Sequence, residues 1–140
     1  PEIFDEASVG EFFKYGNGKA LTIITYGNGL YLSIQAKKEI EKKINKKIQV
    51  IDLCWLSDIN IEKIIKSIGT CKKVLIVDEC RRTGCHGEGI LAQLSSIISP
   101  EINLKLHAAE DSFIPLGKAS RITLPSKNSI IKQAINLINE

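Results

Sequence analysis

The residues best suited to chemistry in this 140-residue chain gather in one short stretch, DECRRTGCHGEGI, at positions 78–90. The stretch contains the cysteines Cys80 and Cys85, the histidine His86 and the arginines Arg81 and Arg82. These residue types suit four kinds of site: a metal site, a redox pair, an anion-binding loop, or a general base beside an acid pair. Each kind of site requires its residues at a particular spacing along the chain, so the sequence can be compared with each requirement in turn.

A structural zinc site needs four cysteine or histidine ligands, and the stretch provides at most three. Cys71 precedes a predicted strand and Cys80 follows it. At ~3.3 Å per residue, the intervening strand separates them by roughly 16–20 Å, which excludes Cys71 as a shared ligand. Cys54 follows one predicted strand and His107 ends another at the same edge, so both stay open as candidates. The poor spacing nevertheless leads us to predict no metal site.

A redox pair is a second interpretation of the two cysteines in this stretch. A loop could bring Cys80 and Cys85 within the ~7 Å between Cα atoms that a disulfide requires. Their C-x4-C spacing differs from the C-x-x-C spacing of thioredoxin-like sites. Four cysteines in a chain of this size and class indicate free thiols in a reducing compartment.

The order strand, glycine-bearing loop, helix favours an anion site, because a helix N-terminus offers N–H groups and a positive dipole end. Arg81 and Arg82 add donors suited to carboxylate or phosphate. However, Gly84 and Gly87 match neither the dinucleotide-binding nor the P-loop pattern. The alternative is that the glycines permit close packing and the arginines form ion pairs at an interface.

Hydrolytic chemistry finds little support in the sequence. The chain has no G-x-S-x-G motif. Asp78 and Glu79 could form an acid pair and His86 could be a general base, but such residues are also ordinary in loops. The residues alone therefore leave His86 open as a general base, although a surface or interface role is more common for such a histidine.

Alternating strands and helices are predicted to position the 78–90 stretch. Short apolar, β-branched runs predict strands at 20–26, 47–53, 73–78 and 102–108. Apolar residues at helical spacing predict helices over 30–43 and 87–98. They also predict a helix that begins after a cap at Ser57 or Asp58 and ends at residue 68, and a last helix that begins after a cap at Ser126. Residues 109–120 are expected to be irregular.

This alternation predicts an α/β fold of three layers, α/β/α, with a mostly parallel sheet of about five strands. An antiparallel edge strand within 11–23 is possible, because Gly16-Asn17-Gly18 is typical of a hairpin turn. Ligands of open α/β sheets bind beyond the carboxyl ends of the strands. Residues 27–29, 78–90 and 109–117 are expected at that edge.

Composition narrows the class of protein. Hydrophobic residues make up 44% of the chain and charged residues 25%, which is typical of a globular domain. The net charge of +3 comes mostly from lysines on predicted helix surfaces, without the interleaved aromatics of a nucleic-acid face. No apolar run reaches the ~20 residues of a membrane span. The chain contains no Met, so we expect a piece of a longer polypeptide.

The motifs form an ordered set along the chain. Thr25-Tyr26-Gly27-Asn28-Gly29 opens a helix, Val77-Asp78-Glu79 leads into Arg82-Thr83-Gly84, Gly87 and Ile90 follow, and Asp111 and Pro115 come after the fourth strand. The set resembles the C-terminal domain of transketolase-like thiamine-diphosphate enzymes. It is most similar to the β subunit or β section of 2-oxo acid dehydrogenase E1 components.

The resemblance covers residues 20–117 well. It implies a domain over 20–140 and a linker or crossover segment from a preceding domain over 1–19. The chain departs from the family at Gly84-Cys85-His86, where a Gly-Gly doublet is usual, and at Gly89, where an acidic residue is common.

The resemblance also implies a function. In such enzymes thiamine diphosphate and Mg²⁺ bind between two other domains, one carrying a GDG motif that this chain lacks. The parent would decarboxylate a 2-oxo acid and reductively acylate a lipoyl group on E2. This domain would serve subunit contacts and E2 docking, with no catalytic, cofactor or metal residue and no nucleic-acid or membrane partner. The interface or anion candidates are Tyr26, Asn28, Asp78, Glu79, Arg81, Arg82, Thr83 and His86.

The expected compartment is the bacterial cytoplasm, or the mitochondrial matrix in a eukaryote. Two alternatives stay open. One is the same domain from deoxyxylulose-phosphate synthase or transketolase. The other is an independent module that binds an anion or nucleotide through the 78–90 stretch.

Overall fold

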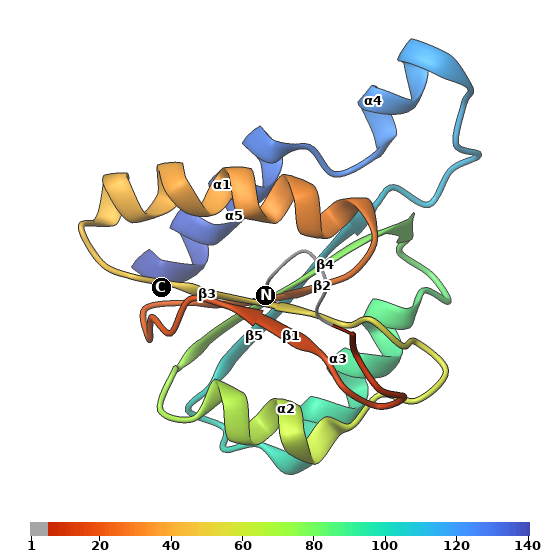
Figure 1. Cartoon of the computed structure of the whole chain (residues 1–140). Coiled ribbons are helices and arrows are strands. Elements are labelled where there is room, and N and C mark those ends of the chain that lie inside the picture. Colours follow the sequence, from red (N-terminus) through yellow and green to blue (C-terminus); the bar gives the residue numbers. More distant parts are fainter. Residues whose placement is uncertain (1–5) are drawn as a thin grey trace.

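A computed structural model describes residues 6–140 as a five-stranded sheet with helices on both faces (Figure 1). The elements are β1 (Phe13–Tyr15), β2 (Thr22–Thr25), α1 (Asn28–Ile44), β3 (Gln49–Asp52), α2 (Ile61–Ile68), β4 (Lys73–Arg81), α3 (His86–Ile97), β5 (Asn103–Ala109), the 3-10 turn η1 (Gly117–Ala119), α4 (Ser120–Thr123) and α5 (Lys127–Asn139). The strand order is β1-β3-β2-β4-β5. Among the strand pairs within residues 6–140, only β1–β3 is antiparallel. The predicted three-layer, mostly parallel fold is confirmed.

Two hydrophobic cores fill the spaces on either side of the sheet. Helices α1 and α5 cover one face, and α2 and α3 cover the other (Figure 1). Successive strand residues point to opposite faces, so Ile23 joins the α1/α5 core and Ile24 joins the α2/α3 core. All four residues of β2 are buried because strands flank it and helices cover both of its faces.

The edge strand expected near the N-terminus is confirmed, but its expected hairpin with β2 is wrong. β1 pairs with β3 instead, with Phe13 opposite Asp52. Both sides of β2 are already occupied by β3 and β4. The glycines of the Gly16–Gly18 segment serve close approach: a Cβ on Gly18 would lie 1.9 Å from the backbone of Lys47.

Part of the segment expected to be a linker thus contributes to the sheet, since β1 lies within residues 1–19. Residues 1–5 of that segment lie outside the described residues. The boundary between linker and domain at residue 19 stays a prediction.

Helix boundaries differ from expectation at α2. Its cap is Asn60, whose side-chain oxygen accepts the N–H of Lys63 at 2.9 Å, and not Ser57 or Asp58. The cap expected at Ser126 is confirmed, because its hydroxyl accepts the N–H of Ser129 and α5 begins at the next residue. The stretch expected to be irregular, residues 109–120, contains η1, and α4 begins at its last residue, Ser120.

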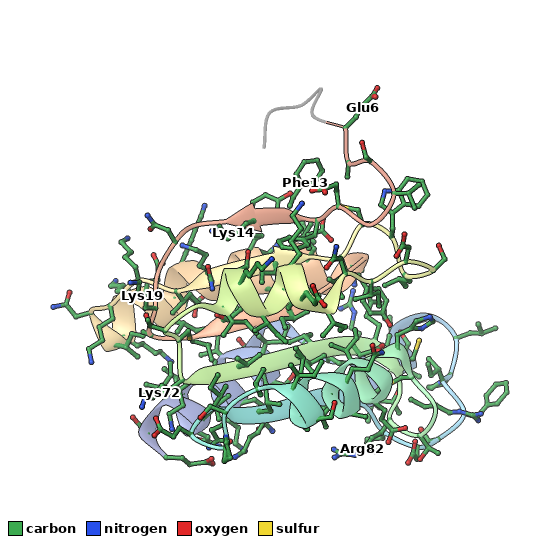
Figure 2. The ribbon with its side chains drawn as sticks, turned by 90° about the horizontal axis from the view of Figure 1, so that it is seen from below. Glu6, Phe13, Lys14, Lys19, Lys72 and Arg82 are labelled. Atoms are coloured by element: carbon green, nitrogen blue, oxygen red, sulfur yellow. The ribbon has the colours of Figure 1, made fainter. Side chains whose placement is uncertain are left out.

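β4 runs three residues further than the sequence predicted, to Arg81, with an irregularity in its pairing with β5 after Val77. Figure 2 shows that Lys72 and Arg82, which bracket this strand, lie toward its two opposite ends. None of the helices within residues 6–140 has the length and apolar character needed to cross a lipid bilayer.

Candidate functional site

The eight candidate residues all lie where the neighbouring strands β2 and β4 end. Tyr26 follows β2 and Asn28 opens α1, while the candidates from Asp78 to Arg81 form the last part of β4. The remaining candidates occupy the turn into α3 or its first residue. The structure therefore places them along one edge of the sheet, where they form an inner and an outer group.

Asp78 is the centre of the inner group and is 1% exposed. Its carboxylate accepts the N–H groups of Cys80 and Gly87, each at 2.8 Å. Burial alone would raise the pKa of Asp78. The Tyr26 hydroxyl and these two N–H groups outweigh burial and lower it. The charged carboxylate thus occupies the positive end of α3 and joins β4 to that helix.

Gly87 is required by this arrangement. A Cβ at this position would lie 2.6 Å from a methyl group of Leu106 and 3.1 Å from the Asp78 carboxylate. Gly89 differs, because a Cβ there would meet no atom within 4 Å. The acidic residue common in the family at position 89 would therefore fit, so the departure at Gly89 leaves the packing of the turn unchanged.

Tyr26 and His86 close the inner group on its outer side. Their rings meet edge to face, with centroids 6.2 Å apart and planes at 73°. The Tyr26 hydroxyl is buried and makes no hydrogen bond of ordinary geometry within residues 6–140. Burial first, and the nearby Asp78 carboxylate second, raise its pKa, so this phenol stays neutral. This contact gives the unusual His86 a packing role.

His86 lacks the surroundings of a general base. It is exposed at the first residue of α3, and its ring makes no hydrogen bond to any side chain in the described part of the chain. A catalytic imidazole is normally oriented by a partner on its second nitrogen.

The outer group is organised by Asp111, which the sequence did not single out as a site residue. Its carboxylate accepts both the N–H and the hydroxyl of Thr83, each at 2.7 Å. These two bonds lower the pKa of Asp111, and the charges of Arg81 and Arg82 lower it further. The contact ties the turn after β4 to the segment that follows β5.

The same turn is closed from within by Glu88, a second residue that the sequence reasoning missed. Its carboxylate accepts the N–H of Gly84 at 2.7 Å. The missed signal was an acidic residue in the first turn of α3, where carboxylates commonly cap N–H groups.

These three carboxylates weigh against an anion site at the turn between β4 and α3. The N–H groups of Thr83, Gly84 and Gly87 are bound by Asp111, Glu88 and Asp78 of the same chain. An external phosphate would have to displace three carboxylates. The N–H groups of Thr83, Gly84 and Gly87 therefore do not form an open cradle for a diphosphate.

Arg81 and Arg82 lie near Asp111 without forming a salt bridge to it. Both are exposed, and neither forms an ion pair within residues 6–140. Arg81 lines a concavity of about 430 Å³ together with Thr83, Asp111, Ser112 and Phe113. Asn28 and Glu79 form a separate pair through a 3.5 Å hydrogen bond. The two arginines are thus available to a partner.

The cysteines are all free thiols. Burial and the charge of Asp78 raise the pKa of both Cys80 and Cys85, whereas a reactive thiol needs a lowered pKa. Burial also lowers the pKa of His107, whose ring contacts the Ser129 hydroxyl at 2.8 Å. Within residues 6–140 no three His, Cys, Asp or Glu side chains are grouped as metal ligands.

Comparison with known proteins agrees with this geometry. The family profile described as "Transketolase, C-terminal domain" matches residues 14–123. Pyruvate dehydrogenase E1 component subunit beta of Staphylococcus aureus is 34% identical over 136 residues, covering 96% of this chain and 42% of the relative. The corresponding Staphylococcus epidermidis subunit is 30% identical over the same share. The chain thus spans about two fifths of the length of these relatives.

Solved structures show the same fold. A split-gene transketolase, described as an inactive beta4 tetramer, superposes with a TM-score of 0.83 at 19% identity, over 99% of this chain and 46% of that one. The 2-oxoglutarate:ferredoxin oxidoreductase of Magnetococcus marinus gives a TM-score of 0.62 at 15% identity, over 91% of this chain and 20% of that one. The resemblance noted in the sequence is confirmed, and the chain belongs to the transketolase C-terminal domain family.

Proposed function

We propose that this chain is the C-terminal domain of the β subunit, or β section, of a 2-oxo acid dehydrogenase E1 component. The observation that carries the proposal is the 34% identity to a pyruvate dehydrogenase E1 β subunit along nearly the whole chain. The parent enzyme would decarboxylate a 2-oxo acid with thiamine diphosphate and Mg²⁺ and then acylate the lipoyl group of E2. We expect it in the bacterial cytoplasm or the mitochondrial matrix.

Within that enzyme, the domain would assemble subunits and dock E2 without taking part in the chemistry. The occupied N–H groups and the high thiol pKa values of Cys80 and Cys85 support a role outside catalysis. Arg81 and Arg82 are the best candidates for a docking contact, because they are exposed without an ion pair in the described region. Guanidinium groups suit bidentate contacts with carboxylates of a partner.

Calorimetry tests whether this domain binds the cofactor by itself. Titration of this chain with thiamine diphosphate and Mg²⁺ should give no binding heat, whereas the full-length polypeptide with its E1 α-type partner should bind the cofactor. Saturable binding to this chain alone would contradict the proposal. Decarboxylation of 2-oxo acids and acylation of lipoyl-E2 by the assembled enzyme then separate an E1 parent from transketolase or deoxyxylulose-phosphate synthase.

Docking is tested by the double substitution R81A/R82A in the assembled enzyme. Removal of two unpaired charges should weaken binding to E2 roughly tenfold, measured by surface plasmon resonance. Decarboxylation without E2 should keep its wild-type rate. Lys132→Ala on α5 removes a charge from another face and serves as the matched control. Unchanged E2 affinity in R81A/R82A would exclude these arginines from docking.

The same substitution tests the alternative of an independent anion-binding module. Such a module would bind inorganic phosphate or a nucleotide and lose that binding in R81A/R82A. The intramolecular carboxylates at the turn weigh against it.

A further inference from the structure

The chain contains the tetrapeptide Tyr-Gly-Asn-Gly twice, at residues 15–18 and 26–29. An asparagine followed by glycine is especially prone to deamidation, because glycine has no Cβ to hinder attack by its main-chain nitrogen on the asparagine side chain. The two copies share the same four residues, so a large difference in their reactivity has to come from the fold. The structure places them in different surroundings.

The first copy lies in the irregular segment that joins β1 to β2. Figure 2 shows the chain turning there, between Lys14 and Lys19. Asn17 is exposed. Within residues 6–140, neither its side chain nor the N–H of Gly18 takes part in a hydrogen bond. The attacking nitrogen and the amide that it would attack are therefore both free of competing partners.

Ring closure requires rotation about the bonds of Asn17, which brings its side-chain carbonyl carbon to the nitrogen of Gly18. Gly18 itself is held in place, because a Cβ on it would lie 1.9 Å from the backbone of Lys47 and the N–H of Ala20 donates to the Lys47 carbonyl at 3.2 Å. The preceding residue, Gly16, has a φ of 84° and the backbone freedom of glycine. The nitrogen is thus fixed, while the exposed side chain that must reach it can turn.

Positive charge near the first copy favours the reaction. The attacking nitrogen loses its proton, so negative charge develops on the main chain. Lys19 follows the copy directly and is exposed. The Lys37 ammonium lies 3.3 Å from the position that a Cβ on Gly16 would occupy. Cations at this range stabilise both the negative charge that develops during attack and the carboxylate that is produced.

The second copy is protected by α1. Asn28 is the first residue of this helix, and helical geometry holds ψ near about −42°, which keeps the Gly29 nitrogen away from the side-chain carbon. Gly29 is buried, and a Cβ on it would lie 2.4 Å from Oγ1 of Thr25, which donates to the carbonyl of Val77 at 3.0 Å. The Asn28 amide donates to Glu79 at 3.5 Å. The backbone and the side chain of this copy are therefore both restrained.

We propose that Asn17 is a site of spontaneous deamidation in the folded protein and that Asn28, in the same tetrapeptide, is protected from it. The Gly18 nitrogen gives up its proton and attacks the side-chain carbonyl carbon of Asn17. A C–N bond forms, the bond to Nδ2 breaks, and ammonia leaves with the proton. Water then opens the five-membered succinimide at either carbonyl and leaves aspartate or isoaspartate at position 17. The sum consumes one water and releases one ammonia, with no redox change and no dependence on the activity of the parent enzyme.

Isoaspartate at position 17 would loosen the edge strand β1. It routes the main chain through the side-chain carbons and adds a methylene before Gly18, where the contact with Lys47 leaves no space. Within residues 6–140, β1 is bound to the sheet along β3 alone. Modified molecules should therefore lose protection from hydrogen exchange in β1, while β2 and β4 in the centre of the sheet keep theirs.

Timed incubation of the full-length polypeptide in mildly alkaline buffer tests the contrast. Trypsin separates the two copies into residues 15–19 and 20–37, and mass spectrometry measures conversion of amide to acid in each. In the native protein, conversion should be at least about tenfold faster at Asn17 than at Asn28. In concentrated urea, where the fold is lost, the two rates should agree within about threefold. Equal native rates, faster conversion at Asn28, or a tenfold ratio that persists in urea would overturn the proposal.

Two substitutions at the same position test the structural consequence. Asn17→Gln removes the site, because the longer side chain closes a six-membered ring much more slowly. Asn17→Asp adds the charge without the extra methylene. After incubation, hydrogen exchange of β1 should be faster in wild type and unchanged in both variants, and circular dichroism should show an intact fold for both before incubation. Wild type that is converted to isoaspartate and still protects β1 would contradict the loosening of this strand.

Discussion

Asp78 is a buried carboxylate whose role follows from its two acceptor oxygens. One binds the N–H of Cys80 and the other binds the N–H of Gly87, at 2.8 Å each. The charge lies at the N-terminus of α3, where the helix dipole stabilises it. This single side chain thereby fixes the geometry of the turn that carries most of the candidate residues.

We expect Asp78→Asn to lower the free energy of unfolding by about 1–3 kcal/mol at pH 7. An amide offers only one acceptor oxygen, so one buried N–H would lose its partner. Urea denaturation measures the change. Asp58→Asn, at an exposed position, should change stability by less than about 0.5 kcal/mol and serves as the control.

The pH dependence of the Asp78→Asn effect has a definite sign. Folding lowers the pKa of Asp78 from about 3.9, its usual unfolded value. Its contribution is therefore fully present above about pH 4 and declines as the pH falls through the lower folded value. The difference between wild type and Asp78→Asn should shrink only in strong acid. A difference that shrinks between pH 8 and pH 6 would contradict this assignment.

Alanine substitutions at the two glycines of α3 distinguish the effect of side-chain packing on stability from the effect of helix propensity. We expect Gly87→Ala to destabilise the protein by about 1–3 kcal/mol, because its Cβ would overlap Leu106. Gly89→Ala should instead stabilise it by up to about 1 kcal/mol, because its Cβ has free space and alanine favours a helix. Thermal denaturation of both variants provides the measurement. Equal effects of the two substitutions would refute the packing argument.

Among the elements, α2 shows how a sequence pattern can predict a helix correctly but assign its N-terminal cap to the wrong residue. Ser57, Asp58 and Asn60 are all residue types that cap helices, and the cap was predicted at Ser57 or Asp58. The structure begins the helix at Ile61, which buries Ile61, Ile64 and Ile68 against the sheet. Burial of this apolar stripe sets where the helix starts, and the residue immediately before it becomes the cap.

This assignment predicts a contrast between two alanine substitutions. Asn60→Ala should lower stability by about 1 kcal/mol, because the N–H of Lys63 loses its acceptor. Ser57→Ala should change stability by less than about 0.5 kcal/mol. Guanidinium denaturation of the two variants tests the contrast. A larger loss in Ser57→Ala would show that the helix begins earlier.

In the whole molecule, one sheet separates two apolar cores that share its strands. Ile40 of α1 belongs to one core and Ile64 of α2 to the other, and both are fully buried. Because β2 and β4 contribute side chains to both cores, loss of one core removes support from the other.

We therefore expect Ile40→Ala and Ile64→Ala each to cost about 2–5 kcal/mol within one cooperative transition. Circular dichroism and Trp55 fluorescence should give coincident curves for both variants. Ile97→Ala on the exposed side of α3 should have little effect and is the matched control. Separated transitions would show that the two faces unfold independently.

By itself, the sequence determined the three-layer class, the four parallel strands and the family. Period-2 and period-3.6 apolar patterns depend on local geometry, which the sequence carries directly. It could not determine the partner of β1, because the Gly16–Gly18 segment has the local signal of a hairpin with β2. That hairpin is impossible because β3 and β4 occupy both edges of β2, and this pairing is known only from the tertiary structure. Nor could it show that Asp111 and Glu88 occupy the turn.

The tertiary structure also decided the character of the 78–90 stretch. Its N–H groups and arginines suggested an anion site, but carboxylates from β4, α3 and the segment after β5 bind the N–H groups of Gly87, Gly84 and Thr83. The sequence shows which hydrogen-bond donors the stretch contains. Whether these donors are free to bind a ligand depends on the acceptors that other segments place next to them in the fold.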